Sequence, residues 1–538
     1  MGKIIPPKLF WILLLAFVTR VFLLSSVPPA LNWDEVSMGY SAYSIMETGM
    51  DEWGDSLPLF FRSYGEWKSP VYIYLLVPFI KLFGLNAWGV RLPAALAGIG
   101  VIYLTYLLAK HLYNEKVGLI AAFLLTISPW HLMLSSPGFE AGVSLLFFLL
   151  GIYLYLLSLD SSRWKHLMGS ALFFGLAPYT YNSAKLLVPL IVGVLLTYSY
   201  KKVKPRKIFI FLLTLALMAT PMIIDFATGN GRARYGQVGI TTDAEAVTEF
   251  YHYRDTFPLP DTLNKVVFNK YTFMVTKSFS NWTSYLSPHF LLGSSSIRPQ
   301  HSLPYRGVIY LFEFFLLIVG LTQLGKYRGL ARTLPIALIV FGFVPAALTK
   351  DPYHVLRSIL TLPAWQILAA LGLTHLIKIK FKYLNLLYAL AAIEVFSFFF
   401  LYYAWYPRAF ARDWQVGYSQ AVEYVDAHQD SYDQIIFTKA YGEPHVFVAF
   451  YSQLDPRIFQ EDSKKLLDYQ LLGLPWVDQL EEYSIGKYTF KQMEWDGGSD
   501  GSRTLYVGKG DDFWADTPIL DKIDFPNGTN AFTITSGR

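Results

Sequence analysis

Two adjacent carboxylates follow the first long apolar stretch of the chain, and their position suits proton transfer. Asp34 and Glu35 come directly after Asn32-Trp33, where a helix over Val36–Glu47 is expected to begin. A structural role is available, because Asp34 can cap this helix and Glu35 can lie near its positive end. A catalytic role is also available, because a carboxylate beside an acceptor hydroxyl can remove its proton. The two roles are compatible, and the neighbouring Trp33 is a candidate substrate contact.

A basic residue in the same region could bind phosphate. Lys68 precedes the apolar stretch Pro70–Phe83, which is too short to cross a bilayer and is expected to lie on its surface as a helix. There Lys68 would meet either anionic lipid headgroups or the phosphate of a bound lipid carrier. Arg62 and Tyr64 lie just before it and are candidate substrate contacts.

Further charged residues lie at the ends of apolar stretches, on the same expected side of the membrane. Arg91 opens one stretch and Glu140 opens another. His354 and Arg357 precede a third, and on a helix they would share one face. The cations could contact headgroups or hold a donor phosphate, whereas Glu140 could pair with Arg91 or Arg20 or shape an acceptor site. Together these residues suit a reaction in which an anionic leaving group departs from a lipid.

Composition places the chain in a membrane. Of its 538 residues, 53% are hydrophobic and 16% are charged, and the mean hydropathy is +0.34. A typical soluble domain has about 25% charged residues, so this chain cannot cover itself with polar surface and needs lipid as its solvent. It has no cysteine, which excludes disulfides, thiolate nucleophiles and cysteine-based zinc sites. The sequence also has no HExxH motif and no phosphate-cradling glycine-rich loop.

Eleven stretches are apolar enough to be membrane-spanning helices. They are Leu9–Val27, Gly89–Ala109, Val117–Leu134, Gly142–Leu159, His166–Pro178, Lys185–Tyr200, Ile208–Phe226, Gly307–Leu324, Leu334–Leu348, Leu356–Ile377 and Tyr383–Tyr403. Lys and Arg occur in every second connection, which by the positive-inside rule places the N-terminus in the cytoplasm and the C-terminus outside. The first stretch is expected to stay attached, because Val27-Pro28-Pro29-Ala30 is a poor cleavage site.

Three long segments are expected on the external face, namely residues 28–88, 227–306 and 404–538. The last of these, the tail, has a soluble composition. Its pattern predicts a helix over Gln420–Gln429 and strands over Gln434–Thr438, Tyr488–Gln492 and Thr504–Val507. We therefore expect a transmembrane domain over residues 1–403 and a small external α/β domain over residues 404–538.

Several short motifs follow one another in a recognisable order. They are Asp34-Glu35, Lys68-Ser69-Pro70, Phe83-Gly84, Val90-Arg91-Leu92-Pro93, Ser128-Pro129-Trp130, Glu140 and the tail segment Phe410–Tyr418. In this order they resemble bacterial GT-C glycosyltransferases of the protein O-mannosyltransferase and lipid A aminoarabinose transferase type. The resemblance covers most of the membrane part. One departure is that Glu140 stands where many members have Asp, often preceded by Arg.

The resemblance implies a fold, a reaction and residue roles. The fold would be an α-helical polytopic membrane protein of the GT-C type, with a large first external loop and an outward-facing cavity. The reaction would be inverting transfer of a sugar from polyprenyl phosphate to a hydroxyl group of a lipid, glycan or protein. Asp34 would act on the acceptor with Glu35 as its partner, and Lys68 would lie near the donor phosphate. Because the leaving phosphate needs positive charge, Arg91 or Arg357 would assist Lys68.

The expected partners follow from this reaction. They are a polyprenyl-phosphate sugar, a hydroxyl acceptor and the lipids of the plasma or inner membrane, with no nucleic acid. No cofactor is expected. A divalent cation could bridge carboxylates and phosphate, but no residue cluster demands one, so we predict a metal-independent reaction.

Two other functions fit parts of the sequence. A transporter or flippase of lipid-linked substrates would carry charges within its spans, as Glu313 and Glu394 do here. These two acids could instead serve hydrogen bonding between helices. A non-catalytic assembly protein would use the external segments as docking surfaces. The outward clustering of acids and the absence of an internal repeat favour the enzyme.

Overall fold

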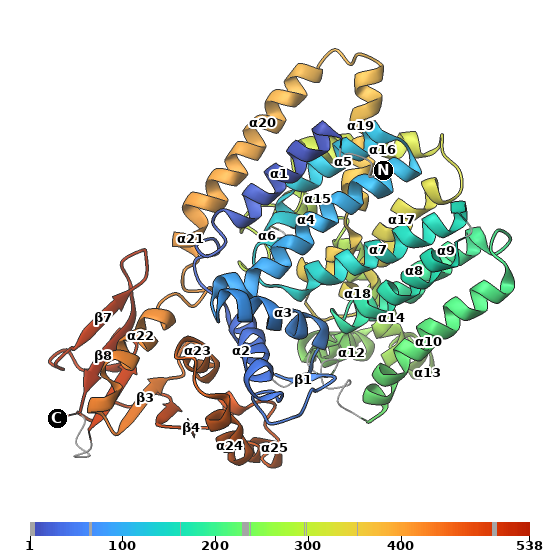
Figure 1. The fold of residues 1–538 in the computed structure, drawn as a ribbon. Helices are drawn as coiled ribbons and strands as arrows, with labels where there is room; N and C mark the ends of the chain where they lie inside the picture. Colours follow the sequence, from blue (N-terminus) through green and yellow to red (C-terminus); the bar gives the residue numbers. More distant parts are fainter. Residues whose placement is uncertain are drawn as a thin grey trace. The chain divides into compact units, whose positions relative to one another are not determined.

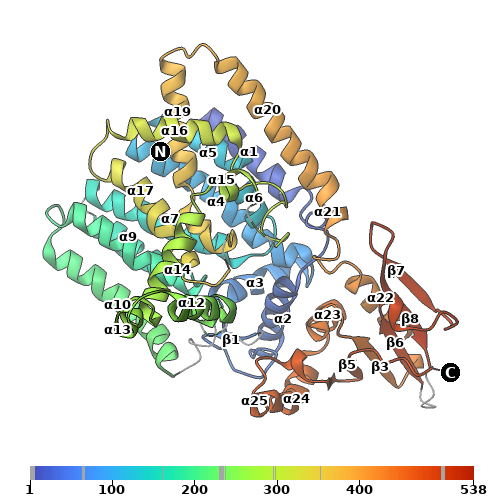
Figure 2. The same cartoon turned by 180° about the vertical axis from the view of Figure 1, so that it is seen from behind.

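The computed structural model describes residues 6–63, 67–161, 163–228, 236, 238–294, 296, 298–351, 353–497 and 503–537. The chain forms two compact units, drawn in Figures 1 and 2. Unit 1 consists of Met1–Arg20, Leu96–Ser135 and Glu140–Phe398. Unit 2 consists of Val21–Ala95, Ser136–Phe139 and Phe399–Arg538. The first external segment and the tail, more than 300 residues apart in the chain, thus belong to one unit.

Apart from an isolated bridge between Gly239 and Thr349, the regular secondary structure among the described residues of unit 1 is helical. Its helices include α1 (Pro7–Val21), α4 (Ala87–Leu112, shared with unit 2), α5 (Glu115–Ile127), α6 (Pro129–Ser135), α7 (Glu140–Ser161), α8 (Trp164–Leu176), α9 (Ala184–Ser199), α10 (Pro205–Thr228), α16 (Leu311–Leu324), α17 (Leu330–Gly342), α18 (Val344–Ala347), α19 (Ala364–Lys378) and α20 (Leu384–Phe400, shared with unit 2). The segment between α10 and α16 forms α12 (Ala244–Thr256), α13 (Asp261–Val267), α14 (Lys270–Ser284) and α15 (Pro288–Leu292). Short 3-10 turns are η1 (Ala177–Tyr179), η2 (Ile240–Thr242) and η3 (Leu356–Thr361).

Each of the eleven predicted spans contains helix, although residues 22–27 of the first, 307–310 of the eighth and 362–363 of the tenth are not helical. Five helical segments are long and apolar enough to cross a membrane, namely Ala87–Leu112, Glu140–Ser161, Pro205–Ala227, Leu330–Ala347 and Leu384–Ala409. Glu115–Ile127 and Pro129–Ser135 form a sixth if this pair, bent by 61°, is one span. The remaining predicted spans are helices too short for that criterion.

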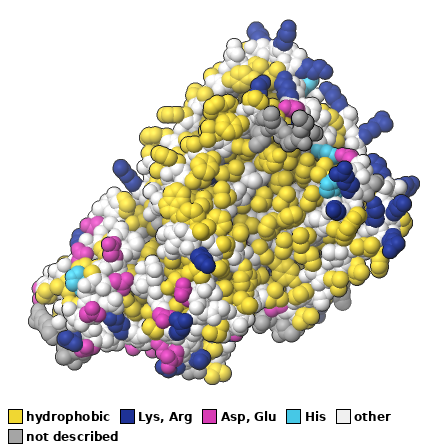
Figure 3. All heavy atoms as spheres, in the orientation of Figure 1, with side chains coloured by type: hydrophobic (Ala, Val, Ile, Leu, Met, Phe, Trp, Pro, Cys, Tyr) yellow, Lys and Arg dark blue, Asp and Glu magenta, His cyan; other side chains and the backbone are white. Residues whose placement is uncertain are grey.

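The outer surface of the unit 1 helices is apolar, as lipid contact requires. Within the apolar windows of α10 and α20, only 6% of the residues are buried. Large side chains such as Phe209, Leu217, Ile393 and Phe396 are exposed there, which water would not tolerate over so wide an area. Figure 3 shows this broad apolar surface, with Lys and Arg side chains gathered along its upper right border. The protein is therefore a membrane protein.

Unit 2 combines helices with a six-stranded sheet. From the first external segment come α2 (Trp33–Thr48), α3 (Pro70–Phe83), β1 (Phe61–Arg62) and β2 (Trp67–Lys68). From the tail come η4 (Leu401–Trp405), α21 (Tyr406–Ala409), α22 (Tyr418–His428), η5 (Gln429–Ser431), β3 (Gln434–Thr438), α23 (Pro444–Tyr451), α24 (Pro456–Leu466), α25 (Asp468–Leu471), η6 (Val477–Gln479), β4 (Glu482–Ile485), β5 (Tyr488–Lys491), β6 (Thr504–Gly508), η7 (Gly510–Asp512), β7 (Asp521–Asp524) and β8 (Asn530–Ser536).

The sheet has the order β4-β5-β3-β6-β8-β7. Central β3 is parallel to β5 and β6, and the outer pairs are antiparallel. Four of the five residues of β3 are buried, which explains why it reads as a continuous apolar run. The predicted α/β tail is confirmed, although β4, β7 and β8 were not expected from the sequence. Helix α23 packs against α2, so the tail and the first external segment share a core.

Helices α16 and α19 of unit 1 approach each other closely at two glycines. A Cβ atom on Gly320 would lie 1.9 Å from the carbonyl oxygen of Leu368, and one on Gly372 would lie 2.1 Å from that of Leu316. The two glycines thus admit the opposite backbone reciprocally, as small residues commonly do between membrane helices.

We expect Gly320→Ala or Gly372→Ala to destabilise unit 1 by about 1–3 kcal/mol, because the added methyl group must push the two backbones apart. The matched control is Gly193→Ala in α9, where an added Cβ meets no described atom within 4 Å. Thermal unfolding of the purified protein in detergent measures the effect. Equal melting temperatures for Gly320→Ala and Gly193→Ala would contradict this packing.

Candidate functional site

The start of α2 is fixed by Asn32, not by the predicted cap Asp34. The Asn32 side chain accepts the backbone N–H of Glu35 at 3.0 Å, and the Glu35 carboxylate accepts the N–H of Asn32 at 3.1 Å. This reciprocal capping box begins the helix at Trp33, three residues earlier than expected. The correction matters for chemistry, because it removes the capping role from Asp34.

A buried ion pair lies beneath this helix start. The Glu35 carboxylate accepts hydrogen bonds from Nε and Nη2 of Arg91 at 2.7 and 3.0 Å, and neither side chain is exposed. Glu35 also accepts the backbone N–H of Gly138 at 2.7 Å. The pair therefore joins α2, the start of α4 and the loop at Ser136–Phe139, and two charges hydrogen-bonded in this way compensate each other's loss of water.

Arg91 has no N–H group left for a ligand. Besides its bonds to Glu35, its guanidinium donates to the carbonyl oxygens of Leu24, Pro28 and Ala30, which accounts for all five N–H groups. The face of the guanidinium lies 5.8 Å from the ring centre of Trp414 in the tail. The predicted phosphate-binding role of Arg91 is thus corrected to a positioning role, because the sequence showed the cation but not its partners.

Asp34 and Lys68 form an ion pair on the accessible side of the same helix turn. Strand β2 carries Lys68 and pairs with β1, with Lys68 opposite Phe61 and Arg62 opposite Trp67. The Lys68 side chain is 10% exposed, whereas that of Asp34 is 41% exposed. An approaching substrate can therefore reach the carboxylate of Asp34, while the Lys68 ammonium group is held beside it.

Two further buried acids were not singled out from the sequence, namely Glu443 of the tail and Glu52 of the segment 28–88. Glu443, the N-cap of α23, is buried. Burial and the neighbouring Asp478 raise the pKa of Glu443 well above its usual range. Lys68 lowers this pKa and Asp34 raises it. Burial and Asp51 likewise raise the pKa of Glu52. Glu443 also has a φ of +51°, a strained angle for a residue other than glycine and one often found at functional sites.

A hydrogen-bonded chain orients His445 beside Glu443. The Tyr483 hydroxyl donates to Asp478 at 2.9 Å, so its oxygen accepts the Nδ1–H of His445, also at 2.9 Å. Burial and Lys439 lower the pKa of His445 to about 3, so the ring is neutral at physiological pH. Its Nε2 is therefore a hydrogen-bond acceptor.

Two predicted phosphate-binding residues, His354 and Arg357, lie in unit 1. Arg357 is buried, and its guanidinium lies 3.4 Å from a carboxylate oxygen of Asp351. The backbone N–H of His354 donates to the Tyr285 hydroxyl at 3.0 Å. The imidazole of His354 lies 5.0 Å from that of His301.

Arg357 also borders a cavity of about 500 Å³ in unit 1. Lys185, Asn182 and Asp225 are among its polar lining residues. Its apolar lining residues are Leu186, Met222, Ile223, Phe226, Val238, Pro345 and Leu348. An apolar cavity bordered by two cations has the character that an anionic lipid headgroup and the start of its chain require.

The remaining predicted site residues have the following places. Trp33 is the first residue of α2 and is half-buried, and Glu140 is the first residue of α7 in unit 1. The guanidinium of Arg62 lies between the rings of Trp53 and Trp67, 5.4 and 5.5 Å from their centres. Tyr64 lies outside the described residues. No group of three or more His, Cys, Asp or Glu among the described residues could hold a metal ion.

Comparison of the whole fold identifies its class. ArnT from Cupriavidus metallidurans, solved with undecaprenyl phosphate bound, superposes with a TM-score of 0.52. The alignment covers 99% of this chain and 97% of that chain, at 14% sequence identity. The chain has the GT-C fold. The predicted fold class is confirmed, and at this identity the likeness concerns the fold alone.

Sequence comparisons match parts of the chain to proteins named as glycosyltransferases. The family model described as dolichyl-phosphate-mannose-protein mannosyltransferase matches residues 67–224. YkcB of Bacillus subtilis, named as a candidate mannosyltransferase, is 25% identical over 31% of this chain and 24% of its own length. The dolichyl-phosphooligosaccharide-protein glycotransferase 2 of Pyrococcus furiosus is 26% identical over 35% of this chain and 26% of its own length. The matches thus span less than a third of these curated relatives.

We expect Arg91→Met to destabilise the protein by about 3–5 kcal/mol, because Glu35 would remain buried without its countercharge. Thermal unfolding in detergent measures this effect. The matched control is Arg503→Met, since Arg503 pairs with Asp433 on the exposed surface, and its loss should leave the melting temperature unchanged. Equal melting temperatures for the two variants would contradict the role given to the buried pair.

Proposed function

We propose that this protein is a membrane glycosyltransferase that moves a sugar from a polyprenyl-phosphate donor to a hydroxyl acceptor. The proposed site lies on the outer face of the membrane, with the N-terminus in the cytoplasm and the tail outside. The observation that carries the proposal is the accessible Asp34 carboxylate, which is paired with Lys68. The buried ion pair between Glu35 and Arg91 positions the helix that carries Asp34, and the chain has the GT-C fold. The matched family and the named relatives support the same class of reaction.

The proposed reaction is a single displacement. The acceptor oxygen attacks the anomeric carbon from the side opposite the phosphate while its proton passes to Asp34. The bond between the anomeric carbon and the phosphate oxygen breaks, and the lipid phosphate leaves with an additional negative charge. The Lys68 ammonium group stabilises this charge. No metal ion takes part in the proposed step.

The ion pair between Asp34 and Lys68 implies that the donor binds before Asp34 removes the acceptor proton. While Lys68 is bound to Asp34, its ammonium group occupies one of the two carboxylate oxygens that could accept the acceptor proton. A donor phosphate competes for the same ammonium group, and binding it releases Asp34 to act on the acceptor. Proton removal is thereby linked to the presence of the donor.

The cavity beside Arg357 and Lys185, which lies within unit 1, is our candidate for binding an anionic lipid. Its apolar lining suits an isoprenoid chain, and its two cations suit an anionic headgroup. Arg357 stays a proposed phosphate ligand in this cavity, with His354 as a neighbour that accepts the backbone N–H of Arg357 at 3.3 Å.

The transporter alternative loses support from the two acids that suggested it. Glu394 accepts the backbone N–H groups of Leu311 and Phe312 at 3.1 and 3.0 Å. Glu313 accepts that of Tyr310 at 3.2 Å. Both acids therefore bind the first N–H groups of α16, which have no partner within the helix. These hydrogen bonds explain both acids by a structural role, without a role in transport.

We expect Asp34→Asn to lower the transfer rate by a factor of about 100 or more, because the amide cannot accept the acceptor proton. The measurement is release of polyprenyl phosphate by the purified protein from a panel of polyprenyl-phosphate sugars, with native membrane extract as the acceptor source. Asp430→Asn, at an exposed carboxylate of the tail, is the control. Near-normal turnover by correctly folded Asp34→Asn would remove Asp34 from the mechanism.

We expect Lys68→Ala to raise the KM for the donor about tenfold or more, because a charge-assisted hydrogen bond to phosphate is lost. Lys68→Arg should restore part of the affinity, since it keeps the positive charge. Lys81→Ala, at the exposed end of α3, is the matched control. An unchanged donor KM in Lys68→Ala would argue against the phosphate role.

A further inference from the structure

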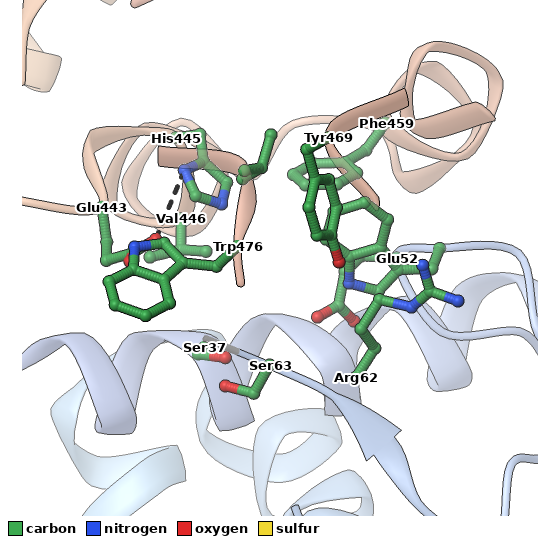
Figure 4. Close-up of a pocket in the computed structure, with 12 residues that line it drawn as sticks. Ser37, Glu52, Arg62, Ser63, Glu443, His445, Val446, Phe459, Tyr469 and Trp476 are labelled. Atoms are coloured by element: carbon green, nitrogen blue, oxygen red, sulfur yellow. Dashed lines mark ion pairs between the residues drawn. The ribbon is translucent and has the colours of Figure 1, made fainter. Parts of the chain in front are cut away.

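Unit 2 contains a small cavity that is lined by residues of the segment 28–88 and by residues of the tail. Figure 4 shows Ser37, Glu52, Arg62 and Ser63 on one side. The tail side carries Glu443, His445, Val446, Phe459, Tyr469 and Trp476. The cavity measures about 20 Å³, which is room for about one water molecule or one hydroxyl group.

Several buried polar atoms at this cavity have no hydrogen-bond partner among the described residues. They are Oε2 of Glu52, Oε2 of Glu443, Nε and Nη1 of Arg62, and Oγ of Ser63. Glu52 and Glu443 are only 4% and 8% exposed. The Glu443 carboxylate lies 3.9 Å from Nδ1 of His445, which is too long for a hydrogen bond. Because native proteins rarely leave such groups unpaired, the cavity is expected to receive a polar group from outside.

The cavity contains both hydrogen-bond donors and acceptors, and this combination indicates which chemical group it would bind. Arg62 donates, Ser63 can donate and accept, and the neutral His445 ring points a nitrogen acceptor into the cavity (Figure 4). A phosphate would meet the two carboxyl groups, and an ammonium group would meet the Arg62 guanidinium. A neutral hydroxyl group, which donates once and accepts twice, satisfies both kinds of partner.

The surrounding walls are aromatic, which favours a sugar as the bearer of the hydroxyl group. Trp53, Phe459, Tyr469 and Trp476 line the cavity beside the polar atoms. Ligand sites commonly combine such apolar walls with a few convergent polar groups. A hydroxyl or hydroxymethyl group fits the narrow interior, and the apolar face of the sugar ring would lie against the aromatic side chains.

The cavity lies close to the proposed catalytic pair. Ser37 follows Asp34 by three residues on α2, so the two side chains share one face of the helix. Lys68 lowers the pKa of both Glu52 and Glu443, which line the cavity, and Asp34 raises that of Glu443, so the charges of the pair act directly on the cavity. A sugar anchored in the cavity would therefore be held next to the carboxylate that is proposed to deprotonate it.

We propose that this cavity, formed by Glu52, Arg62 and Ser63 with Glu443 and His445 of the tail, is a subsite that binds a hydroxyl group of a sugar acceptor. The inference rests on the proposed function and makes its substrate class narrower: the acceptor is a glycan or glycolipid, and the tail takes part in selecting it.

Binding of methyl hexopyranosides to the full-length protein in lipid nanodiscs tests the proposal. Nanodiscs are needed because maltoside detergents themselves present sugar. Saturation-transfer NMR with a panel of methyl glucosides, mannosides and galactosides should show binding of at least one of them. Glu52→Ala and Glu443→Ala should weaken this binding about tenfold or more, as expected for loss of a hydrogen bond to a buried group. Ser63→Val, which narrows the cavity but keeps both acids, should do the same.

The controls separate this inference from the proposed function. Asp34→Asn should lower the transfer rate by a factor of about 100 or more yet keep glycoside binding, and Asp430→Asn should change neither. Glycoside binding that survives Glu52→Ala, Glu443→Ala and Ser63→Val in folded protein would overturn the subsite, as would the absence of binding by every glycoside in the panel. Binding with the expected losses in a protein that transfers no sugar would support the subsite and count against the proposed function alone.

Discussion

The buried ion pair between Glu35 and Arg91 is the interaction on which the candidate site depends. It connects the start of α2, the start of α4, the Ser136–Phe139 loop and, through the ring of Trp414, the tail. A buried charge pair is costly unless every polar atom is satisfied, and here all five N–H groups of Arg91 are used. Because these hydrogen bonds leave few other positions for the start of α2, Asp34, one residue before Glu35, is held in a defined orientation.

Neighbouring acids thereby acquire different duties. Glu35 is fully buried and neutralised by Arg91, whereas the Asp34 side chain is 41% exposed and paired with Lys68. A single step along the helix is enough to direct one carboxylate into the protein and the other toward an accessible surface, because successive residues of a helix point in different directions. The division explains how a structural role and a catalytic role can both arise from the single dipeptide Asp34-Glu35.

The tail supplies the second set of acids. The N–H of Glu443 is held by Asp478 at 3.2 Å, and the chain from Asp478 through Tyr483 fixes the ring of His445. Connected polar networks are rigid when all their hydrogen bonds are made. Buried polar atoms that lack a hydrogen bond therefore indicate where a group from outside is expected. In this unit the unsatisfied atoms of Glu52, Arg62, Ser63 and Glu443 all lie at one cavity. The six-stranded sheet therefore acts as a support that holds His445 and Glu443 in place.

The sequence by itself determined the helical membrane part, the α/β tail and the prominence of Asp34, Glu35 and Lys68. Apolar periodicity and strand patterns are local signals, and local signals are readable along a chain. The tertiary structure alone decided that Arg91 is enclosed by Glu35 and three carbonyl groups, and that Glu443 and His445 face Glu52 and Arg62. These facts depend on contacts between residues up to about 400 positions apart. Burial, partners and the resulting pKa values belong to such contacts, and a sequence lists the charges without showing what surrounds them.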